Sequence, residues 1–450
     1  MKIGLIGNMN NNNFSILRYF RDLGADAHLL LNSNDGKGSL SHFKPECDTW
    51  NIAKWKPYIH QTPIPDSPVA ALDLPYSLVF GLRSRIWSWL SFKIYQTPIV
   101  TINQIQQAYD KYDRLIASGI SPATLNRARV KLNVFYPYSS GVEYLCTESF
   151  LAKFRGGLGI NKYLLTRVSQ QQANGICAAN NVINGDMGLT NDVLLDLGIQ
   201  PINLFIPMLY DRDEVPKDPP TSVLRDILGA ILNSNFILLH HSRLMWCNPG
   251  CYSNDAWAHE NKNNDWLLRS FSSFLKKRPT IKACLLMLEY GPDVAATKRL
   301  ATDLGVNSSI HWLPKMDRRE IMWLLSHASI GFGEFNDVPR MIWGGTGWEV
   351  LASGKPLIQR FNFDKGEFER IYGYPSPPML PVRNQDDVLR HLLDMADNVE
   401  KRIEIGGAAK KWFESYNGIG LARQWLEIVT NTCEGGVYKK NSPFNQGVHD

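Results

Sequence analysis

The stretch "KIGLIGNMNNNNFSILRYFRDLGADAHLLL", residues 2–31, contains the unit that decides the fold. "KIGLIG" is a short apolar run bounded by a turn, which is typical of a strand. "FSILRYFRDLG" repeats apolar residues at helical spacing and ends in Gly, and "ADAHLLL" is a second apolar run. A strand, a helix and a strand in this order predict the start of a parallel sheet with helices on its faces.

The loop "NMNNNN", residues 8–13, lacks the glycines that are usual between such a strand and helix. Asn adopts left-handed backbone conformations more readily than most residues, so this run can still turn tightly. It can also offer backbone N–H groups near the start of the following helix. A plain polar loop is the alternative interpretation.

A second alternation of strand and helix patterns begins after the Pro-rich, acidic stretch 201–222. With 450 residues, the chain is also too long for one hydrophobic core. We therefore expect two α/β domains in series, with the boundaries 1–205, 206–234 (linker), 235–405, 406–431 (terminal helices) and 432–450 (flexible tail). Within the first domain, "TPIVTIN" (97–103) predicts a strand and "LLTRVSQQQANGICAANNVI" (164–183) predicts a helix.

The net charge of +5 is unevenly distributed, because residues 50–170 hold 14 Lys+Arg and 6 Asp+Glu. Such a surface can attract nucleic acid, anionic lipid or a phosphorylated acceptor, or it can be an ordinary solvated face. No nucleic-acid reading module is recognisable, so we expect no nucleic-acid partner. The basic, aromatic stretch "GLRSRIWSWLSFKIY", 81–95, suggests either peripheral contact with a membrane or a helix packed on a sheet.

Seven cysteines at irregular spacing do not form a recognisable disulfide framework, which favours a reducing compartment. No run of 18 apolar residues is present, so no membrane-spanning helix is expected. These features predict a cytoplasmic protein, peripheral at the inner face of the membrane if residues 81–95 bind lipid.

A second informative stretch is "GGTGWEVLASGKPLIQRF", 344–361, which places Gly344, Gly345 and Thr346 before a helix that carries Glu349. Glycines let a phosphate approach the N–H groups of a helix start. One carboxylate can accept hydrogen bonds from both hydroxyls of a ribose diol. The combination indicates a nucleotide site.

Ligands of parallel sheets bind outside the carboxyl ends of the strands, so the residues that follow each strand pattern are site candidates. In the second half these residues include Arg243, Gly291, Lys315 and Met316. The guanidinium of Arg243 suits a diphosphate. We therefore expect these residues to meet Glu349 in one crevice that binds a nucleotide sugar.

The C-terminal half resembles retaining GT-B glycosyltransferases of the family-4 type. The resemblance runs in family order through "HHSRL", "NDWLLRSFSSFLKKRP", "LLMLEYGPDVAATKRLATDLGV", "SIHWLPKMDRREIMWLLSHA" and "GGTGWEVLASGKPLI". It covers residues 235–360 well and the "KIGLIG" unit loosely. It implies a GT-B fold, in which two Rossmann-like doubly wound domains face each other across a cleft. The N-terminal domain would bind the acceptor, the C-terminal domain would bind the donor, and the C-terminal helices would pack back on the first domain.

The resemblance also implies roles for individual residues. Arg243 and Lys262 match the phosphate-binding Arg and Lys, Lys315 and Met316 match the region near the base, and Glu349 matches the second Glu of a Glu-x7-Glu motif. The first Glu of that motif falls at Met341, which cannot bind sugar hydroxyls as a carboxylate does. Either Glu334 or Asp337 takes its place, or the donor sugar is held differently.

By the same resemblance, Arg243, Lys262 and Asn10 would be the catalytic residues, and the acceptor would enter beside the Asn loop, with Asn12 on the acceptor side. His60 and Asp73 are further acceptor-side candidates, because the family's His after the fourth strand has no counterpart. The reaction would be sugar transfer with retention, without a metal or another cofactor. The group His240, His241, Cys247, Cys251 and His259 has a mixed-ligand composition that suits zinc, but its spacing matches no standard zinc site.

We therefore expect a hexosyltransferase-type enzyme that moves a sugar from a nucleotide-diphosphate sugar to an acceptor hydroxyl. The acceptor would belong to a surface polysaccharide, a glycolipid or a glycoprotein glycan. A GT-B-fold sugar-nucleotide epimerase and a non-catalytic sugar-nucleotide-binding partner subunit are the alternatives.

Overall fold

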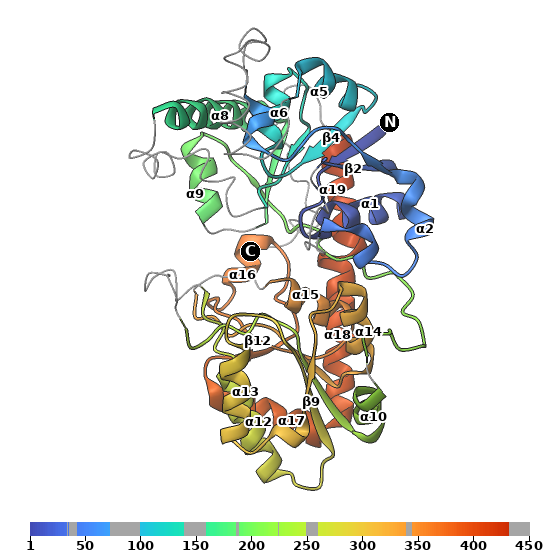
Figure 1. Ribbon diagram of the computed structural model, residues 1–450, viewed down its shortest axis with the longest axis vertical. Coiled ribbons are helices and arrows are strands. Elements are labelled where there is room, and N and C mark those ends of the chain that lie inside the picture. The colour runs from blue at the N-terminus through green and yellow to red at the C-terminus, as the bar shows by residue number, and fades with distance from the viewer. Residues whose placement is uncertain are drawn as a thin grey trace, which may run out of the picture.

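The computed structural model describes residues 1–33, 35, 43–72, 100–138, 159–185, 189–223, 225–248, 260–338 and 344–431. These residues form two parallel β-sheets, one in each half of the chain, with helices on both faces of each sheet. Figure 1 shows the two halves one above the other, joined along one side by the C-terminal helices. The predicted fold class, two Rossmann-like doubly wound domains, is confirmed.

The first sheet has the strand order β3-β2-β1-β4-β5-β6-β7, and all of its described pairs are parallel. The order reverses between β1 and β4, which creates a crevice at the carboxyl ends of these two strands. The strands are β1 (Lys2–Ile6), β2 (Asp26–Leu31), β3 (Ile59–Gln61), β4 (Arg114–Ala117), β5 (Val134–Phe135), β6 (Asn181–Asn184) and β7 (Ile202–Asn203).

The second sheet has the strand order β10-β9-β8-β11-β12-β13, again with parallel pairs. Its order reverses between β8 and β11. The strands are β8 (Phe236–His240), β9 (Ala283–Leu288), β10 (Ile310–Leu313), β11 (Ile330–Phe332), β12 (Leu357–Arg360) and β13 (Leu380–Val382).

The α-helices follow the strands in the alternation that the sequence patterns predict. In the first half they are α1 (Asn12–Asp22), α2 (Ile52–Trp55), α5 (Ile102–Tyr109), α6 (Ser121–Arg127), α8 (Gly159–Cys177) and α9 (Leu189–Asp196). The later helices are α10 (Arg225–Asn233), α12 (Asp265–Lys277), α13 (Val294–Asp303), α14 (Arg318–His327), α15 (Gly345–Ala352), α16 (Glu367–Tyr372), α17 (Gln385–Asp397), α18 (Val399–Tyr416) and α19 (Ile419–Thr430).

Alternating side chains of the central strands supply two apolar faces. On β1, Leu5 belongs to the cluster that contains Phe14 of α1, whereas Ile6 belongs to the cluster that contains Ile105 of α5. Successive strand residues point to opposite faces, so a strand buried on both sides has to be apolar throughout. This explains why the pattern "KIGLIG" predicts a strand correctly.

Two local predictions are wrong in part. Of "TPIVTIN", the described residues 100–103 form no strand, because Thr101 caps α5 with a capping box and Ile102 begins the helix. Of the long helix predicted to end at Ile183, the last part is β6, beginning at Asn181. In both cases apolar periodicity is ambiguous, and the cap or the pairing with a neighbouring strand decides the structure. Helix α10 lies within the stretch 206–234 that is predicted as a linker, and strand β7 lies just before that stretch.

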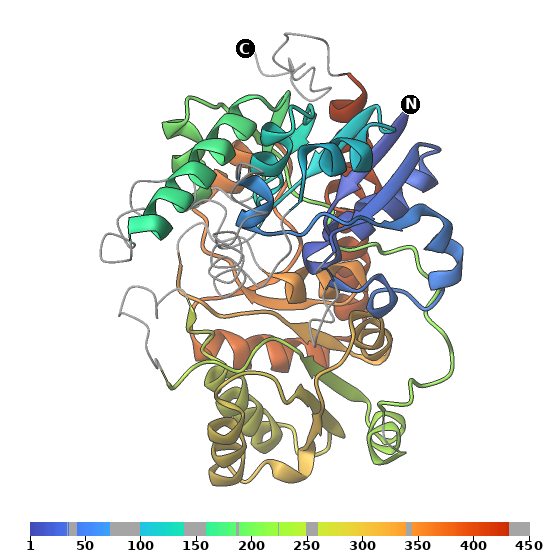
Figure 2. The ribbon, with the colours of Figure 1, turned by 45° about the horizontal axis from the view of Figure 1, so that its top comes forward.

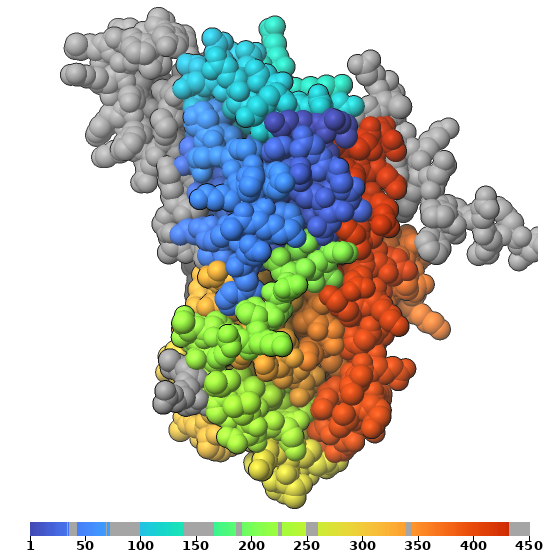
Figure 3. Space-filling view, turned by 90° about the vertical axis from the view of Figure 1, so that its right-hand side faces the viewer, coloured from blue at the N-terminus to red at the C-terminus, as the bar shows by residue number. Residues whose placement is uncertain are grey.

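The C-terminal helices return from the second half to the first. Figures 2 and 3 show α18 and α19, in orange-red and red, running along the side of the molecule past both halves. Helix α18 packs against α15, and α19 packs against α1. The Trp425 indole, fully buried on α19, donates from Nε1 to the Phe205 carbonyl over 2.8 Å and meets the ring of Tyr136 at 5.3 Å.

Helix α15 ends at Ala352, just before the sequence "SGKP", residues 353–356. Gly354 follows the C-cap with φ of +69°, a left-handed conformation that glycine adopts without steric cost. A Cβ on Gly406 of α18 would lie 2.3 Å from the Gly354 carbonyl oxygen. The two glycines therefore allow α18 to approach the end of α15 closely.

Within the described ranges, every helix is too short or too polar to traverse a lipid bilayer. The stretch 81–95 and the tail 432–450 lie outside the described residues.

Replacement of Trp425 by Ala should lower the free energy of unfolding by about 3–5 kcal/mol, because it leaves a cavity between α19 and the first sheet. Urea denaturation followed by circular dichroism measures this change. Glu427→Ala, an exposed position on the same helix, should change stability by at most about 0.5 kcal/mol. Equal losses for the two variants would contradict the packing role of Trp425.

Candidate functional site

A cleft with a volume of about 450 Å³ lies between the two halves. Its first-half residues are Asn10, Asn11 and Cys47, and its other residues follow the carboxyl ends of the strands in the second sheet. The cleft brings together nine of the residues predicted from sequence: Asn10, Arg243, Lys262, Lys315, Met316, Glu334, Gly345, Thr346 and Glu349.

The start of α15 opens into this cleft. Gly344 is the N-cap residue, and a Cβ placed on it would be 3.7 Å from Glu334 Oε1. A Cβ on Gly345 would be 4.0 Å from both Arg318 Nη2 and Glu349 Oε1. Among the described residues, the buried Thr346 Oγ1 has no hydrogen-bond partner. The helix start therefore places backbone N–H groups at the cleft, which is the arrangement that binds anions at helix N-termini.

Glu349 is held by two side chains that the sequence reasoning did not assign to the nucleotide site. Its Oε2 accepts from His241 Nε2 at 2.9 Å, and its Oε1 accepts from Arg318 Nε at 2.8 Å. Burial would raise the pKa of this carboxyl, but the His241 hydrogen bond and the charge of Arg318 outweigh burial and lower it. Glu349 is thus a carboxylate in a fixed orientation.

The sequence contained partial signals for both residues. His241 directly follows β8 and was considered only as a possible zinc ligand, whereas its Nε2 contacts Glu349. Arg318 is the first residue of α14, after the capping residue Asp317, close to the carboxyl end of β10. Position relative to the strands thus identifies both as candidates, but only the structure shows which carboxylate they bind.

The two predicted phosphate-binding cations are each paired with an acid. Arg243 Nη2 lies 2.5 Å from Glu260 Oε2, and Lys262 Nζ lies 2.5 Å from Glu334 Oε1. The Lys262–Glu334 pair is largely buried, with exposed side-chain fractions of 9% and 13%. Any anion that binds these cations has to compete with carboxylates already in place.

Of the two acids considered as substitutes for the missing motif Glu, only Glu334 lines the cleft. The carboxylate of Asp337 is 70% exposed and pairs with Arg360. Met341 lies outside the described residues.

The Asn loop adopts the left-handed conformations that its composition predicts, with φ of 53° at Asn10 and 59° at Asn11. Asn10 Nδ2 donates to the Tyr138 hydroxyl over 2.9 Å. Asn12 is fully buried at the start of α1 and does not line the cleft.

Two other predicted residues, Gly291 and His60, do not line the cleft. Gly291, with φ of +124°, lets the loop after β9 approach the backbone of Leu244, where a Cβ would meet the carbonyl oxygen at 2.3 Å. His60 lies on β3 with its Nε2 2.9 Å from His28 Nδ1, and it does not line the cleft. Asp73 lies outside the described residues.

The described part of the zinc-like group does not assemble into a metal site. His240 Nε2 lies 3.0 Å from Ser242 Oγ and 3.1 Å from Asn264 Nδ2, and burial lowers the His240 pKa to about 3. No group of three or more His, Cys, Asp or Glu side chains among the described residues could hold a metal ion. Cys251 and His259 lie outside that part of the chain.

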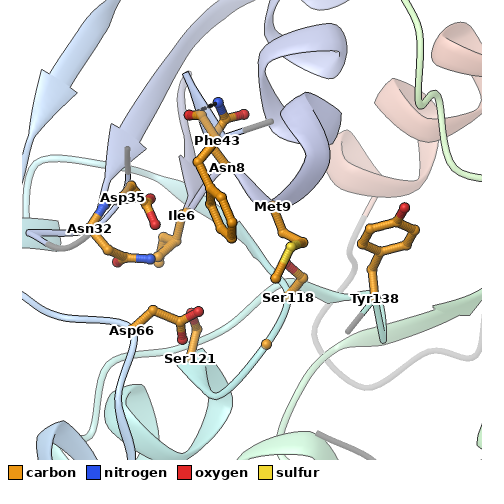
Figure 4. Close-up of a pocket in the computed structure, with 12 residues that line it drawn as sticks. Ile6, Asn8, Met9, Asn32, Asp35, Phe43, Asp66, Ser118, Ser121 and Tyr138 are labelled. Carbon is orange, nitrogen blue, oxygen red and sulfur yellow. Dashed lines mark hydrogen bonds between the residues drawn. The ribbon is translucent and has the colours of Figure 1, made fainter. Parts of the chain in front are cut away.

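A smaller pocket, of about 10 Å³, lies at the carboxyl ends of β1, β2 and β4 in the first half. Figure 4 shows Asp35, Asp66 and Ser121 around it, together with Tyr138. Burial, and to a lesser degree the neighbouring Asp66, raises the Asp35 pKa to about 7, and burial also raises the Asp66 pKa. Tyr138, which lines the small pocket, accepts a hydrogen bond from Asn10, which lines the cleft.

The sequence matches no family profile and no curated protein. The structure, however, is similar to solved glycosyltransferases over nearly the whole chain. HepE from Anabaena, solved with UDP and glucose, is 14% identical, covers 96% of this chain and 99% of its own, and has a TM-score of 0.55. A glycosyltransferase from Rickettsia africae is 15% identical over 97% and 99% of the two chains, with a TM-score of 0.53. These likenesses show that the fold is GT-B.

Asp35 provides a test of the small pocket. Its pKa is about 7 in the folded chain and 3.8 without the fold, so the folded state binds more protons between these values. Stability should therefore fall as pH rises from about 4 to 7. Asp35→Asn should remove this part of the pH dependence, so that the variant gains stability over wild type at pH 8 but not at pH 4.

The measurement is the melting temperature of both proteins from pH 4 to 8. Asp303→Asn, at an exposed position on α13, should leave the wild-type profile unchanged. Parallel profiles for Asp35→Asn and wild type would show that the Asp35 carboxyl does not titrate in this range.

Proposed function

We propose that this protein is a glycosyltransferase that moves a sugar from a nucleoside-diphosphate sugar to an acceptor hydroxyl. The observation that carries the proposal is the convergence of Arg243, Lys262 and Glu349 with the start of α15 in one interdomain cleft. The set combines cations and N–H groups for a diphosphate with a carboxylate for a diol.

The donor would bind along the second-half wall of the cleft. The diphosphate would contact Arg243, Lys262 and the N–H groups of Gly345 and Thr346. It would replace Glu260 as the partner of Arg243 and Glu334 as the partner of Lys262. The ribose hydroxyls donate to Glu349. The base lies near Lys315 and Met316, and Glu334 accepts from hydroxyls of the donor sugar.

UDP is the nucleotide to test first. HepE has been solved with UDP-glucose, and a TarM variant from S. aureus with UDP and a GlcNAc-glycerol; the latter has a TM-score of 0.50 and is 10% identical. Both support a nucleoside diphosphate as the ligand of this fold, and neither specifies the donor of this chain.

In the reaction, the bond between the sugar's anomeric carbon and the diphosphate breaks, and the acceptor oxygen bonds to that carbon. The acceptor proton moves to the departing diphosphate, whose developing charge is stabilised by Arg243, Lys262 and the α15 N–H groups. This chemistry transfers a hexose with retention and needs no metal or other cofactor, as the family-4 resemblance implies.

The acceptor would approach from the first half, past Asn10. Its hydroxyl would belong to a surface polysaccharide, a glycolipid or a glycoprotein glycan. A lipid-linked acceptor is consistent with a cytoplasmic protein whose stretch 81–95 contacts the inner face of the membrane.

The ribose role of Glu349 is tested by thermal shift with a panel of nucleotide sugars. A donor at one hundred times its Kd should stabilise the wild type by about 2.7 kcal/mol, and Glu349→Gln should lose most of this effect because it loses the charged acceptor. Glu414→Ala, exposed on α18, is the matched control and should respond as wild type does. An undiminished shift in Glu349→Gln would exclude the ribose assignment.

Product analysis with the stabilising donor then separates the possible activities. A new glycoside, with the nucleoside diphosphate released only when acceptor is present, supports the transferase. An epimerised donor would instead identify an epimerase, and binding without turnover would identify a partner subunit.

The diphosphate role of Arg243 is tested by calorimetric titration with UDP and with uridine. Arg243→Ala should weaken UDP binding by about tenfold or more, because it removes a hydrogen bond to a charged group, and should leave uridine binding unchanged. Arg269→Ala, an exposed arginine on α12, should bind both ligands as wild type does. If Arg243→Ala weakened the binding of UDP and of uridine equally, Arg243 would not contact the diphosphate.

A further inference from the structure

A row of buried charges leads from the cleft into the first half of the chain. Glu349 pairs with Arg318, whose Nη1 donates to Asp48 Oδ1 over 2.8 Å. The other oxygen of Asp48 accepts from Arg18 of α1, and Arg18 Nη1 donates to Asp213 over 2.8 Å. Charged side chains therefore link three parts of the chain that are distant in sequence. These are α1 through Arg18, the segment after Cys47 through Asp48, and α14 through Arg318.

Arg318 is the member that joins the two halves. Its side chain is 13% exposed, and besides Asp48 its Nη1 donates to the Met208 carbonyl at 3.2 Å and the Asn10 carbonyl at 3.4 Å. The guanidinium of Arg318 thus donates to Glu349, in the second half, through Nε. Through Nη1 it donates to three oxygen atoms of the first half and the linker. The guanidinium is planar and rigid, so its bond to Asp48 through Nη1 fixes the direction in which Nε donates to Glu349.

We propose that Asp48 and Arg318 are positioning residues for Glu349, so that the first half of the chain sets the affinity of the donor nucleotide. This inference rests on the proposed function of Glu349. Asp48 has a fully buried side chain and does not line the cleft, so it acts on the nucleotide only through Arg318.

The geometry leaves room for the ribose. A carboxylate has about four acceptor directions, and Arg318 and His241 each use one, on different oxygens. One direction on each oxygen stays available for the two hydroxyls of a diol. Orienting the carboxylate before the nucleotide arrives reduces the conformational cost of binding. Without Asp48, Arg318 would lose its first-half anchor, and Glu349 would lose this orientation.

Asp211 offers a matched control. Its side chain is 2% exposed, its Oδ2 accepts from Lys410 Nζ of α18 over 2.8 Å, and its Oδ1 accepts from the Tyr19 hydroxyl of α1 over 2.6 Å. Like Asp48, it is a buried carboxylate that links α1 to the second half of the chain. Unlike Asp48, it makes no contact with Arg318 or Glu349 in the described structure.

Calorimetric titration with UDP tests the proposal on Asp48→Asn, Asp211→Asn, Glu349→Gln and the double variant Asp48→Asn/Glu349→Gln. Asp48→Asn should raise the Kd for UDP about tenfold, as expected for coupling between charged neighbours. Asp211→Asn should lower the melting temperature about as much as Asp48→Asn does, because each variant removes one buried carboxylate. The Kd of Asp211→Asn for UDP, however, should stay within about twofold of the wild-type value. The double variant should bind no more weakly than Glu349→Gln alone.

Three results would overturn the proposal: an unchanged Kd in Asp48→Asn, equal weakening by Asp211→Asn, or a full additional loss in the double variant. If Asp48→Asn does not fold, Arg318→Lys replaces it. Lysine keeps the charge but cannot reach both carboxylates in the same fork, so the same tenfold loss is expected.

A second measurement does not depend on UDP binding. It therefore distinguishes a failure of the proposed function from a failure of the positioning role of Asp48 and Arg318. In 15N-histidine NMR, the His241 Nε2–H that donates to Glu349 should change its chemical shift in Asp48→Asn and keep it in Asp211→Asn. A wild-type protein that binds no nucleotide would contradict the proposed function alone. An unchanged His241 signal in Asp48→Asn would contradict the positioning role.

Discussion

Arg318 is a guanidinium buried where the two halves meet, and it pairs with a carboxylate from each side, Asp48 and Glu349, so that it links the halves of this protein. Burial of an unpaired charge costs several kcal/mol, so Arg318 restricts the arrangement to one in which Glu349 and Asp48 both reach it. The apolar contacts of α19 add area to the interface, but they are less directional. The ion pairs of Arg318 thus favour one alignment of the halves, and buried residues such as Trp425 add apolar packing.

The same electrostatics shapes the cleft. The two cations proposed to bind the diphosphate are each paired with an acid, Arg243 with Glu260 and Lys262 with Glu334. A diphosphate would gain less from Lys262 than a free cation could offer, because it has to replace Glu334. That competition makes binding sensitive to the whole ligand: a sugar whose hydroxyls engage the released Glu334 recovers what the phosphate loses. Under the proposed function, this exchange would favour a nucleotide sugar over a nucleoside diphosphate.

Sequence reasoning was most successful where local and tertiary requirements coincide. The second-half strands are apolar on both faces and end in polar residues at the cleft, so their pattern predicted the sheet and several of the residues that line the cleft. The secondary structure predicted from apolar periodicity was wrong at residues 100–103, where a capping box starts helix α5, and at residues 181–183, where pairing with a neighbouring strand forms β6. His60 illustrates another limit, because a polar residue in a strand can serve a partner on the sheet, here His28, rather than the site.

The sequence by itself determined the alternation of strands and helices, the left-handed Asn loop and the glycine entrance of α15, because backbone preferences and apolar periodicity are local properties. It also placed Glu349 near that entrance. Only the tertiary structure decided which groups face Glu349, that Glu334 rather than Asp337 lines the cleft, and that Asp48 lies behind Arg318. Such ion pairs join residues as far apart as 48 and 318, and their partners depend on how two separate sheets dock, which no local pattern records.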